Sequence, residues 1–471
     1  MSPAPLLLSR RQALRWAAGA AAGLALGPLR ARARGAGRRD FNVRDFGARG
    51  GGAGADTAAI QRAIDAAAAA GGRVVVPGGG RFVVGSLVLR GGIDFHLADD
   101  AELRVSARAE DYAGAGAVFT ARDADGLSIS GTGSVDGRSP DFMTGYDPAG
   151  EWWKPAAFRP RLFQLTGCRG LEVRGVTLRR APSWTLHLVG CQGVLVDGIK
   201  IRNQLDVPNC DGIDPDHCRD VEIRGCDISC GDDAIVIKTT RQGAAHGPSS
   251  GITVKDCVLE TQDSGVKIGT ETTQDISRIR FERCTVKTGS RGLCIQLRDE
   301  GDISDVTFAD ITLLARCYAD PWWGRGEALS LTAIPRRPGA RIGRIRGVTL
   351  RNVRGRAENS ARICGSPESR IRDVTLENVA VELDRWTRYP GGLWDNRPTS
   401  AEPEIERRGS IPVFGLRDAD QVVLRGCRAS WGAHRPEYFT HALEAERVSG
   451  LRLDDFRGEA ARPGVEAVVQ R

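Results

Sequence analysis

Five aspartates stand close together near the middle of the chain, where two neighbouring segments repeat one pattern. Asp211, Asp214 and Asp216 lie in the first segment, and Asp232 and Asp233 lie in the second. The 21 residues from Asp211 to Asp232 are about one coil of a parallel β-helix. Because strands on successive coils stack about 4.8 Å apart, the spacing predicts that these carboxylates meet on one face of the molecule.

Clustered carboxylates suit the hydrolysis of a glycosidic bond. Several acids within a few ångströms cannot all ionise freely, so one keeps its proton while others stay charged. The protonated acid can donate to the leaving oxygen, and an ionised neighbour can activate water or attack. The same residue types also form calcium sites and tight polar corners, and spacing alone leaves these alternatives open.

Short strands with alternating apolar residues recur along the chain. The pattern RGLEVRGVTL begins at Arg169 and returns at spacings of 23, 27, 31, 27 and 27 residues, at Gln192, Arg219, Ser250, Ser277 and Ser304. Weaker copies start at Asp125, Arg346, Arg372, Asp420 and Ser449. Each copy reads as a strand, a polar corner and a second strand, which predicts an all-β fold, a single-stranded right-handed parallel β-helix. A solenoid grows as one body, so 471 residues need not mean several domains.

A helix is predicted at the start of this body. Asp56 can cap it, Ile60 and Ile64 are spaced to share one face, and Gly71 ends it. Such a helix would cover the open N-terminal end of the solenoid.

Residues 1–33 resemble a twin-arginine export signal. Arg10 and Arg11 precede an apolar run from Trp16 to Leu29, and Ala31-Arg32-Ala33 offers small residues for cleavage. The run is short for a membrane span, although a retained anchor is the alternative. We therefore expect a signal at 1–33, a β-helix catalytic domain at 34–471, a periplasmic or secreted location, and no stable membrane span after cleavage.

The charge balance argues against a nucleic-acid partner. The formal net charge is +7, but residues 1–33 hold five arginines and no acids, so the remainder carries 61 − 59 = +2. A nearly neutral mature protein lacks the basic surface that nucleic acid requires.

The 12 cysteines mostly fit the interior of a β-helix. Seven stand beside a turn or strand of a repeat, as expected of small apolar side chains stacked inside the coil: Cys168, Cys191, Cys218, Cys226, Cys257, Cys284 and Cys427. If an exported protein oxidises any of them, Cys226 with Cys230 or Cys210 with Cys218 are the expected disulfides. No spacing suits zinc, and we expect neither a metal ion nor a cofactor.

Several motifs together resemble the polygalacturonase family, family 28 of the glycoside hydrolases. They are an opening strand and helix, Arg159-Pro160-Arg161-Leu162-Phe163, Ala181-Pro182-Ser183-Trp184-Thr185-Leu186-His187, Asn209-x-Asp211-Gly212-Ile213-Asp214 and Gly231-Asp232-Asp233-Ala234-Ile235-x-Ile237-Lys238. The match runs from about residue 40 to about residue 310. The resemblance implies a pectin lyase-like solenoid and inverting hydrolysis of pectin-related poly- or oligosaccharides. It also implies that Asp232 is the general acid and that Asp211 and Asp233 hold the nucleophilic water. Inversion requires room between acid and base, roughly 6.5 to 9.5 Å.

Two motifs of that family are missing. Asp263 and Ser264 stand where a Gly-His-Gly motif belongs, and His246 lies earlier, in an apparent inserted loop. Cys294 and Gln296 replace the cations of an Arg-Ile-Lys motif. In the family these cations bind a sugar carboxylate, a task suited to charged donors, so plain polygalacturonate becomes a doubtful substrate. A neutral or differently decorated sugar is equally open.

Other residues are candidates for sugar binding. Lys267, Arg291, Arg298 and Arg325 can supply a substitute charge, or can be solvated turn residues. One of Trp322 and Trp323 can stack on a pyranose ring, and the loop from Trp386 to Pro398 is a similar candidate; packing is the alternative for both. Trp184 and His187 read as core and corner residues, and His217 reads as structural. The predicted substrate contacts are Asn209, Asp214, Lys238, Asp263, Lys267, Arg298, Trp323 and Arg325.

Two other functions remain open from the sequence. A calcium-dependent polysaccharide lyase shares the solenoid and uses aspartates. A carbohydrate-binding β-helix that has lost catalysis fits the missing motifs. The leading expectation is an exported glycosidase, because the two acidic motifs occur in order, one coil apart.

Overall fold

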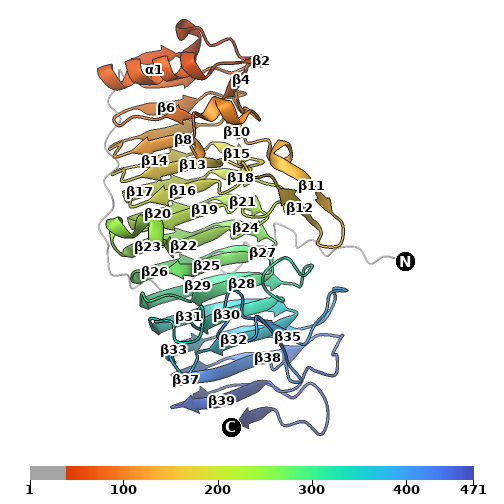
Figure 1. The fold of residues 1–471 in the computed structure, drawn as a ribbon. Coiled ribbons are helices and arrows are strands. Elements are labelled where there is room, and N and C mark those ends of the chain that lie inside the picture. Colours follow the sequence, from red (N-terminus) through yellow and green to blue (C-terminus); the bar gives the residue numbers. More distant parts are fainter. Residues whose placement is uncertain (1–38) are drawn as a thin grey trace, which may run out of the picture. The chain divides into compact units, whose positions relative to one another are not determined.

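The repeated strands wind into a solenoid in which each coil adds strands to three parallel columns (Figure 1). A computed structural model describes residues 39–471, so the predicted signal at 1–33 lies outside the described residues. Pairing is parallel and in register between coils, as for Val173 with Val196 and Val196 with Ile223. This arrangement confirms the predicted right-handed parallel β-helix.

The three columns form three faces. The first face contains β5 (Leu87–Val88), β8 (Ala117–Arg122), β13 (Arg161–Thr166), β16 (Leu186–Val189), β19 (Ile213–Asp216), β22 (Ile235–Thr239), β25 (Ser264–Thr272), β28 (Arg291–Leu297), β30 (Glu327–Ala333), β32 (Asn359–Cys364), the start of β37 (Phe414–Arg425), β39 (Leu443–Ser449) and β41 (Val468–Gln470). The second contains β1 (Asp40–Asn42), β3 (Arg73–Val76), β6 (Asp94–Leu97), β9 (Ser128–Gly131), β14 (Glu172–Arg174), β17 (Gln192–Asp197), β20 (Arg219–Arg224), β23 (Ser249–Lys255), β26 (Ile276–Glu282), the starts of β29 (Ile303–Ala315) and β31 (Ile345–Ala357), β33 (Ile371–Glu377), the end of β37 and β40 (Arg452–Asp454). The third contains β2 (Gly51–Ala55), β4 (Arg81–Val84), β7 (Glu102–Val105), β10 (Ser134–Asp136), β15 (Thr177–Arg179), β18 (Lys200–Arg202), β21 (Asp227–Cys230), β24 (Val258–Thr261), β27 (Thr285–Gly289), the ends of β29 and β31, β34 (Ala380–Leu383) and β38 (Arg428–Trp431).

Two hairpins stand outside the columns. They are β11 (Met143–Asp147) with β12 (Trp152–Pro155), and β35 (Leu393–Asp395) with β36 (Ile405–Arg407), and both are antiparallel. Four short 3-10 turns interrupt the coils at Val43–Phe46, Ala109–Tyr112, Ser139–Phe142 and Arg241–His246. The second hairpin lies in the long interval between the repeat copies that start at Arg372 and Asp420, where loop structure is expected.

Helix α1 (Thr57–Ala70) lies at the N-terminal end of the solenoid, as predicted (Figure 1). Ile60 and Ile64 are buried, and Gly71 ends the helix in the left-handed region with φ 71°. The predicted cap is wrong in one respect. The carboxylate of Asp56 accepts hydrogen bonds from the backbone N–H groups of Arg49 and Gly50, and it makes none to the helix.

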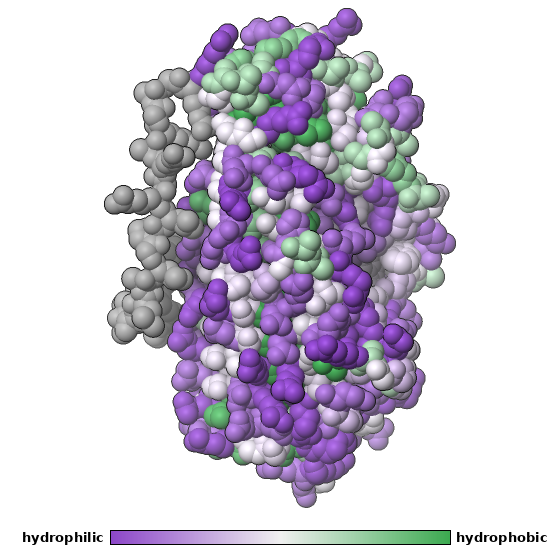
Figure 2. All heavy atoms as spheres, turned by 60° about the vertical axis from the view of Figure 1, so that its left-hand side comes forward, coloured by the Kyte–Doolittle hydropathy of each residue, from purple (hydrophilic) through white to green (hydrophobic). Residues whose placement is uncertain are grey.

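The interior is filled by stacked aliphatic and aromatic side chains. On β20, for example, Val221 and Ile223 point inward and are buried. Outside, hydrophilic side chains predominate on the face drawn in Figure 2. Val88 and Tyr146 are the only large hydrophobic side chains exposed among residues 39–471.

All twelve cysteines are buried free thiols. The proposed disulfides between Cys226 and Cys230 and between Cys210 and Cys218 are therefore not formed. Cys210 instead approaches the carbonyl oxygen of Val207 at 3.0 Å. Ten of the twelve belong to the hydrophobic core of the coil, as expected for small apolar side chains, whereas Cys294 and Cys317 are buried outside that core.

Candidate active site

The aspartates lie in the turns that precede three successive strands of the first face. Asp211 precedes β19, Asp232 and Asp233 precede β22, and Asp263 precedes β25. Successive coils approach closely here, because Gly212 has no side chain: a Cβ atom at this position would lie 2.3 Å from the carbonyl oxygen of Ala234. The turns therefore bring acidic residues from consecutive coils side by side.

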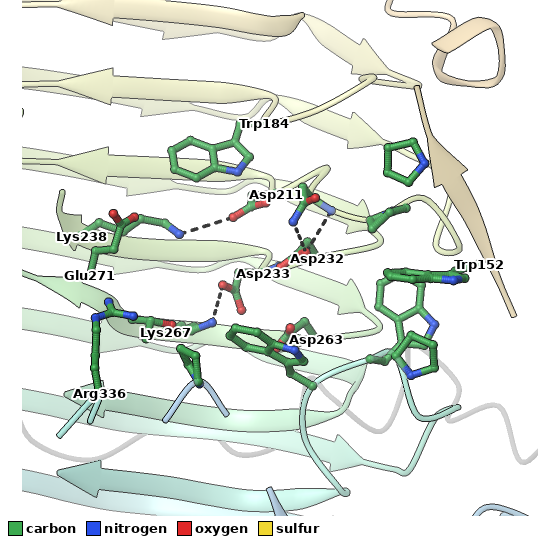
Figure 3. Close-up of a pocket in the computed structure, with 18 residues that line it drawn as sticks. Trp152, Trp184, Asp211, Asp232, Asp233, Lys238, Asp263, Lys267, Glu271 and Arg336 are labelled. Atoms are coloured by element: carbon green, nitrogen blue, oxygen red, sulfur yellow. Dashed lines mark hydrogen bonds and ion pairs between the residues drawn. The ribbon is translucent and has the colours of Figure 1, made fainter. Parts of the chain in front are cut away.

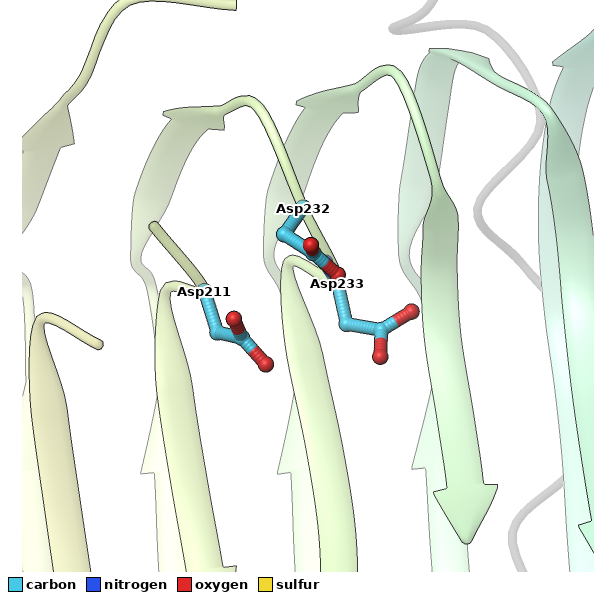
Figure 4. Close-up of side chains that lie close together, drawn as sticks. All are labelled: Asp211, Asp232 and Asp233. Atoms are coloured by element: carbon cyan, nitrogen blue, oxygen red, sulfur yellow. The ribbon is translucent and has the colours of Figure 1, made fainter. Parts of the chain in front are cut away.

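Asp211, Asp232 and Asp233 form the tightest group (Figure 4). One carboxylate oxygen from each lies within 4.8 Å of the others. Asp211 and Asp233 are buried, whereas Asp232 is partly exposed. We refer to these three residues as the acidic trio.

Asp232 is held at the mouth of this group by Asn209. Its Oδ2 atom accepts a hydrogen bond of 3.0 Å from the backbone N–H of Asn209, and its Oδ1 atom accepts one of 2.9 Å from that of Asp233. Burial and the charges of Asp211 and Asp233 nevertheless raise the pKa of Asp232 to about 7. Asp232 can therefore carry a proton near neutral pH.

Asp233 has the opposite environment. Its Oδ2 atom lies 2.7 Å from the Nζ atom of Lys267, and its Oδ1 atom accepts a hydrogen bond of 3.3 Å from the backbone N–H of Ser264. Burial alone would raise the pKa of Asp233, but the charges of Lys267 and Lys238 outweigh it and lower that pKa below its ordinary value. Asp233 is therefore the member of the trio that stays ionised.

Asp211 lies near a second lysine. Its Oδ2 atom is 3.7 Å from the Nζ atom of Lys238, which stands 4.6 Å from the centre of the Trp184 ring. Its Oδ1 atom is buried and has no hydrogen-bond partner in the protein. Burial and the neighbouring Asp214 raise the pKa of Asp211, although Lys238 opposes this. The carboxylate oxygens of Asp214 are likewise buried, so the two acids share one enclosed polar environment beside Lys238.

The acidic trio opens into a cavity of about 450 Å³ (Figure 3). This volume falls within the usual range for pockets that bind small molecules. Eighteen residues line it: Trp152, Pro155, Trp184, Pro208, Asn209, Asp211, Asp232, Asp233, Lys238, Asp263, Lys267, Thr270, Glu271, Pro321, Trp322, Trp323, Arg336 and Pro398. Its combination of carboxylates, ammonium groups and indole rings is suited to a sugar, which offers hydroxyl groups and an apolar ring face.

Eight of the predicted site residues that the structure places line this cavity: Asn209, Asp211, Asp232, Asp233, Lys238, Asp263, Lys267 and Trp323. Asp263 is buried, and burial raises its pKa to about 7. Trp323 is half-buried, while its neighbour Trp322 is almost completely buried. Trp322 therefore packs inside the protein and Trp323 is the accessible side chain, as anticipated. Both residues lie in a turn.

Three predicted substrate contacts do not line the cavity. Asp214 is fully buried behind Lys238, whose Nζ atom lies 3.8 Å from its Oδ1. Arg298 is buried and donates to the carbonyl oxygen of Asn396 at 2.9 Å. Arg325 is buried and pairs with Asp320 at 3.0 Å. Arg291, the further candidate, is also fully buried. All three arginine side chains are buried, and none of them lines the cavity.

Other lining residues escaped the sequence reasoning. Trp184 was expected in the core, but it lines the cavity. Its position 27 residues before Asp211, about one coil earlier, is the signal that could have placed it there. Trp152, Glu271 and Arg336 also line the cavity. Trp152 stands on the β11–β12 hairpin, and Arg336 is held by Asp299 at 2.5 Å. No local pattern marked these residues.

The histidines lie elsewhere. His246 packs against Gly190, beyond the opposite end of the strands, so the inserted loop does not bring it to the trio. His187 and His217 are buried structural residues. His187 bonds to Asp216 at 3.2 Å, and His217 contacts the carbonyl oxygen of Thr240 at 2.8 Å.

The acidic trio also has the residue types of a cation site. Lys267 and Lys238, however, already place ammonium groups at 2.7 Å from Asp233 and at 3.7 Å from Asp211. A divalent cation would have to compete with both positive charges. The arrangement therefore suits proton transfer better than it suits calcium.

The chain matches known carbohydrate-active proteins. The sequence model of the glycosyl hydrolases family 28 matches residues 68–388. A probable polygalacturonase from Vitis vinifera is 26% identical over 376 residues, which cover 72% of this chain and 73% of that protein. An endo-polygalacturonase from Pectobacterium carotovorum subsp. carotovorum is 26% identical over 239 residues, which cover 42% and 59%.

Solved structures show the same fold. A family 28 exopolygalacturonase from Yersinia enterocolitica superposes with a TM-score of 0.68 at 18% identity and covers 90% of this chain and 79% of its own. An exopolygalacturonase from Thermotoga maritima gives 0.62 at 22% identity and covers 82% and 92%. These findings do not favour a lyase or a non-catalytic binding protein. The chain belongs to family 28 of the glycosyl hydrolases and is a glycosidase of the polygalacturonase type.

Proposed function

We propose that the protein hydrolyses glycosidic bonds in pectin-related poly- or oligosaccharides with inversion, after export by its twin-arginine signal. The observation that carries the proposal is the contrast within the acidic trio. Asp232 keeps a proton near neutral pH, while Asp233, only a few ångströms away, is held ionised by Lys267. Such a difference between adjacent carboxyl groups is what separate acid and base roles require.

In the proposed reaction, Asp232 donates its proton to the leaving glycosidic oxygen. Asp233 takes a proton from a water molecule, and Asp211, beside it in the acidic trio, orients that water. The water oxygen then attacks the anomeric carbon as the bond to the leaving oxygen breaks. Both oxygens of Asp233 are engaged, by Lys267 and by Ser264, which favours a base that holds water over a nucleophile that forms an ester.

One sequence-based argument for inversion is not met. Oxygens of the trio lie within 4.8 Å, which is less than the roughly 6.5 to 9.5 Å usual between the carboxyl groups of inverting enzymes. The proposal of inversion therefore rests on family membership and on the engaged oxygens of Asp233.

Both lysines also bear on the substrate. Lys238 and Lys267 reach the cavity floor from β22 and β25, whereas Cys294 and Gln296 offer no charge on β28. We propose that this pair meets an acidic or strongly polar sugar beside the cleaved bond. The two ammonium groups already face carboxylates, so a neutral sugar that hydrogen-bonds to them is the second candidate.

A panel of purified pectic oligosaccharides tests the function. Oligogalacturonides and rhamnogalacturonan oligosaccharides are incubated with the enzyme, and proton nuclear magnetic resonance follows the first anomer released. Release of the anomer opposite to the substrate linkage is expected. The retained anomer would overturn inversion, and absence of hydrolysis across the panel would overturn the proposed activity. Ultraviolet-absorbing unsaturated products that require calcium would identify a lyase.

A further inference from the structure

The outer side of the first face is covered beyond β25. Every residue of β28, β30 and β32 is buried, as in β16, β19 and β22 on the same face, whereas β26 and β33 on the second face alternate between buried and more exposed residues. Since Leu293, Ile295 and Leu297 fill the interior of the coil, the residues between them must be covered from outside. A segment far along the sequence supplies this cover.

That cover is the closing segment, residues 393–399. Asn359 donates to the carbonyl oxygen of Leu393 at 2.7 Å. Arg362 donates to the side chain of Asn396 at 2.8 Å, and Gln296 donates to the carbonyl oxygen of Arg397 at 2.6 Å. These contacts join β28 and β32 to the segment. Gln296, which stands where the related family has a substrate-binding lysine, is therefore occupied by the protein itself.

Buried charges fix the closing segment. Asp395 is 1% exposed, and its carboxylate pairs with Arg397 at 2.6 Å and with Arg291 at 3.7 Å. It also accepts a hydrogen bond of 2.7 Å from the backbone N–H of Gly324. The arginines more than offset the effect of burial and lower the pKa of Asp395 to about 2. Because freeing one member of a buried ion pair is strongly unfavourable, the segment is a fixed wall and not a mobile lid.

This wall stands directly beside the catalytic groups. Pro398, at its end, lines the cavity together with Trp323, while the acidic trio lies on the coils of β19 and β22. Only the coil of β25 separates the trio from the wall. At about 4.8 Å per coil, this leaves room for about one sugar ring on that side.

The β11–β12 hairpin closes a second side. Trp152 and Pro155 line the cavity, and the Trp152 ring meets that of Trp322 edge to face, with centres 6.1 Å apart. At the tip, Glu151 accepts a hydrogen bond of 2.6 Å from Tyr389. It also pairs with Arg388. The hairpin is thereby tied to the loop that leads into the closing segment.

We propose that the closing segment makes the cleft a dead end, so that the enzyme removes short units from the ends of saccharide chains. An interior bond needs a path for the chain on both sides of the trio, and the wall leaves such a path on one side only. This inference rests on the proposed function, and it assigns to Asp395 and its partners a role in selecting chain ends.

Product analysis tests this proposal. Tri- to octagalacturonides, and the matching rhamnogalacturonan series, are labelled at the reducing end and followed by chromatography from the earliest conversion. The expected result is one short product that accumulates from the start, with the remaining chain shortened stepwise. Early products of intermediate length would overturn the inference while leaving the hydrolytic function intact. No cleavage of either series would overturn the proposed function and this inference together.

Variants connect the result to the closing segment. Asp395→Asn is expected to raise the share of interior cleavage several-fold. The double variant Gln296→Ala with Thr399→Val removes hydrogen bonds of the segment without freeing a charge, and it serves if Asp395→Asn does not fold. Glu404→Ala, at an exposed position beyond the segment, is the matched control. An unchanged product pattern in a folded variant of the segment would overturn its role.

Discussion

The Nζ atom of Lys267 lies 2.7 Å from Oδ2 of Asp233, and both side chains are almost completely buried. This pairing places a fixed positive charge beneath the acidic trio. Its charge helps to lower the pKa of Asp233 below the ordinary value, while the pKa of Asp232 is raised to about 7. The order of proton affinities among the three carboxyl groups therefore depends on one ammonium group.

Replacing Lys267 by methionine should shift the pH profile of kcat/KM toward higher pH. Lys267 lowers the pKa of both Asp233 and Asp232, so its loss raises both. The ionised base then disappears at a higher pH on the acidic side, and the protonated acid persists to a higher pH on the alkaline side. At acidic pH we expect activity to fall by about one to two orders of magnitude. Lys287→Met, at an exposed position, is the control. If activity falls but the pH profile of kcat/KM keeps its position on both the acidic and the alkaline side, the electrostatic role of Lys267 is refuted.

Asp232→Asn should reduce kcat by about two to four orders of magnitude, since asparagine cannot donate the proton that the leaving oxygen requires. The fold should persist, because Asp232 is partly exposed and the substitution keeps its shape. Release of reducing ends and thermal unfolding followed by circular dichroism measure the two effects. Full activity in the variant would remove Asp232 from the mechanism.

Trp323→Ala should raise KM about tenfold with little change in kcat, equivalent to about 1.4 kcal/mol of binding. The indole ring lines the cavity, and loss of a stacking surface weakens the bound ground state and transition state alike. Trp431→Ala, on β38 away from the cavity, is the matched control. Equal KM values for the wild-type protein and Trp323→Ala would assign this ring to packing.

Replacing both Arg10 and Arg11 by lysine should strand the protein in the cytoplasm, because a twin-arginine signal depends on the arginine pair. Fractionation of the producing cells and immunoblotting measure the distribution. Export at the wild-type level would argue against this type of signal.

The repeat pattern predicted the fold because it is local and recurs in every coil. The 21-residue spacing of Asp211 and Asp232 places their turns on successive coils, where β19 and β22 pair. The family resemblance, and not the spacing, drew attention to Asp263, and Lys267 was named as a substitute for missing cations; β25 places both one coil further. The positions of residues that depend only on the strand register could therefore be predicted from the sequence.

Contacts made by loops that are distant in the sequence could not be predicted in this way. Arg298 appeared available for substrate, but Asn396, almost a hundred residues later, covers it. Arg325 was misjudged because nothing in its own segment reveals burial. Trp184 was misread because a tryptophan beside a strand suggests packing, and only its position one coil before Asp211 indicates the cleft.

The buried cysteines have a practical consequence. The chain reaches this fold with all twelve thiols reduced, so no oxidising compartment is required to complete it. Burial raises the pKa of Cys210 and Cys230, which leaves little reactive thiolate for air or peroxide to attack. Production in a reducing host should therefore yield the same molecule as production in an oxidising one.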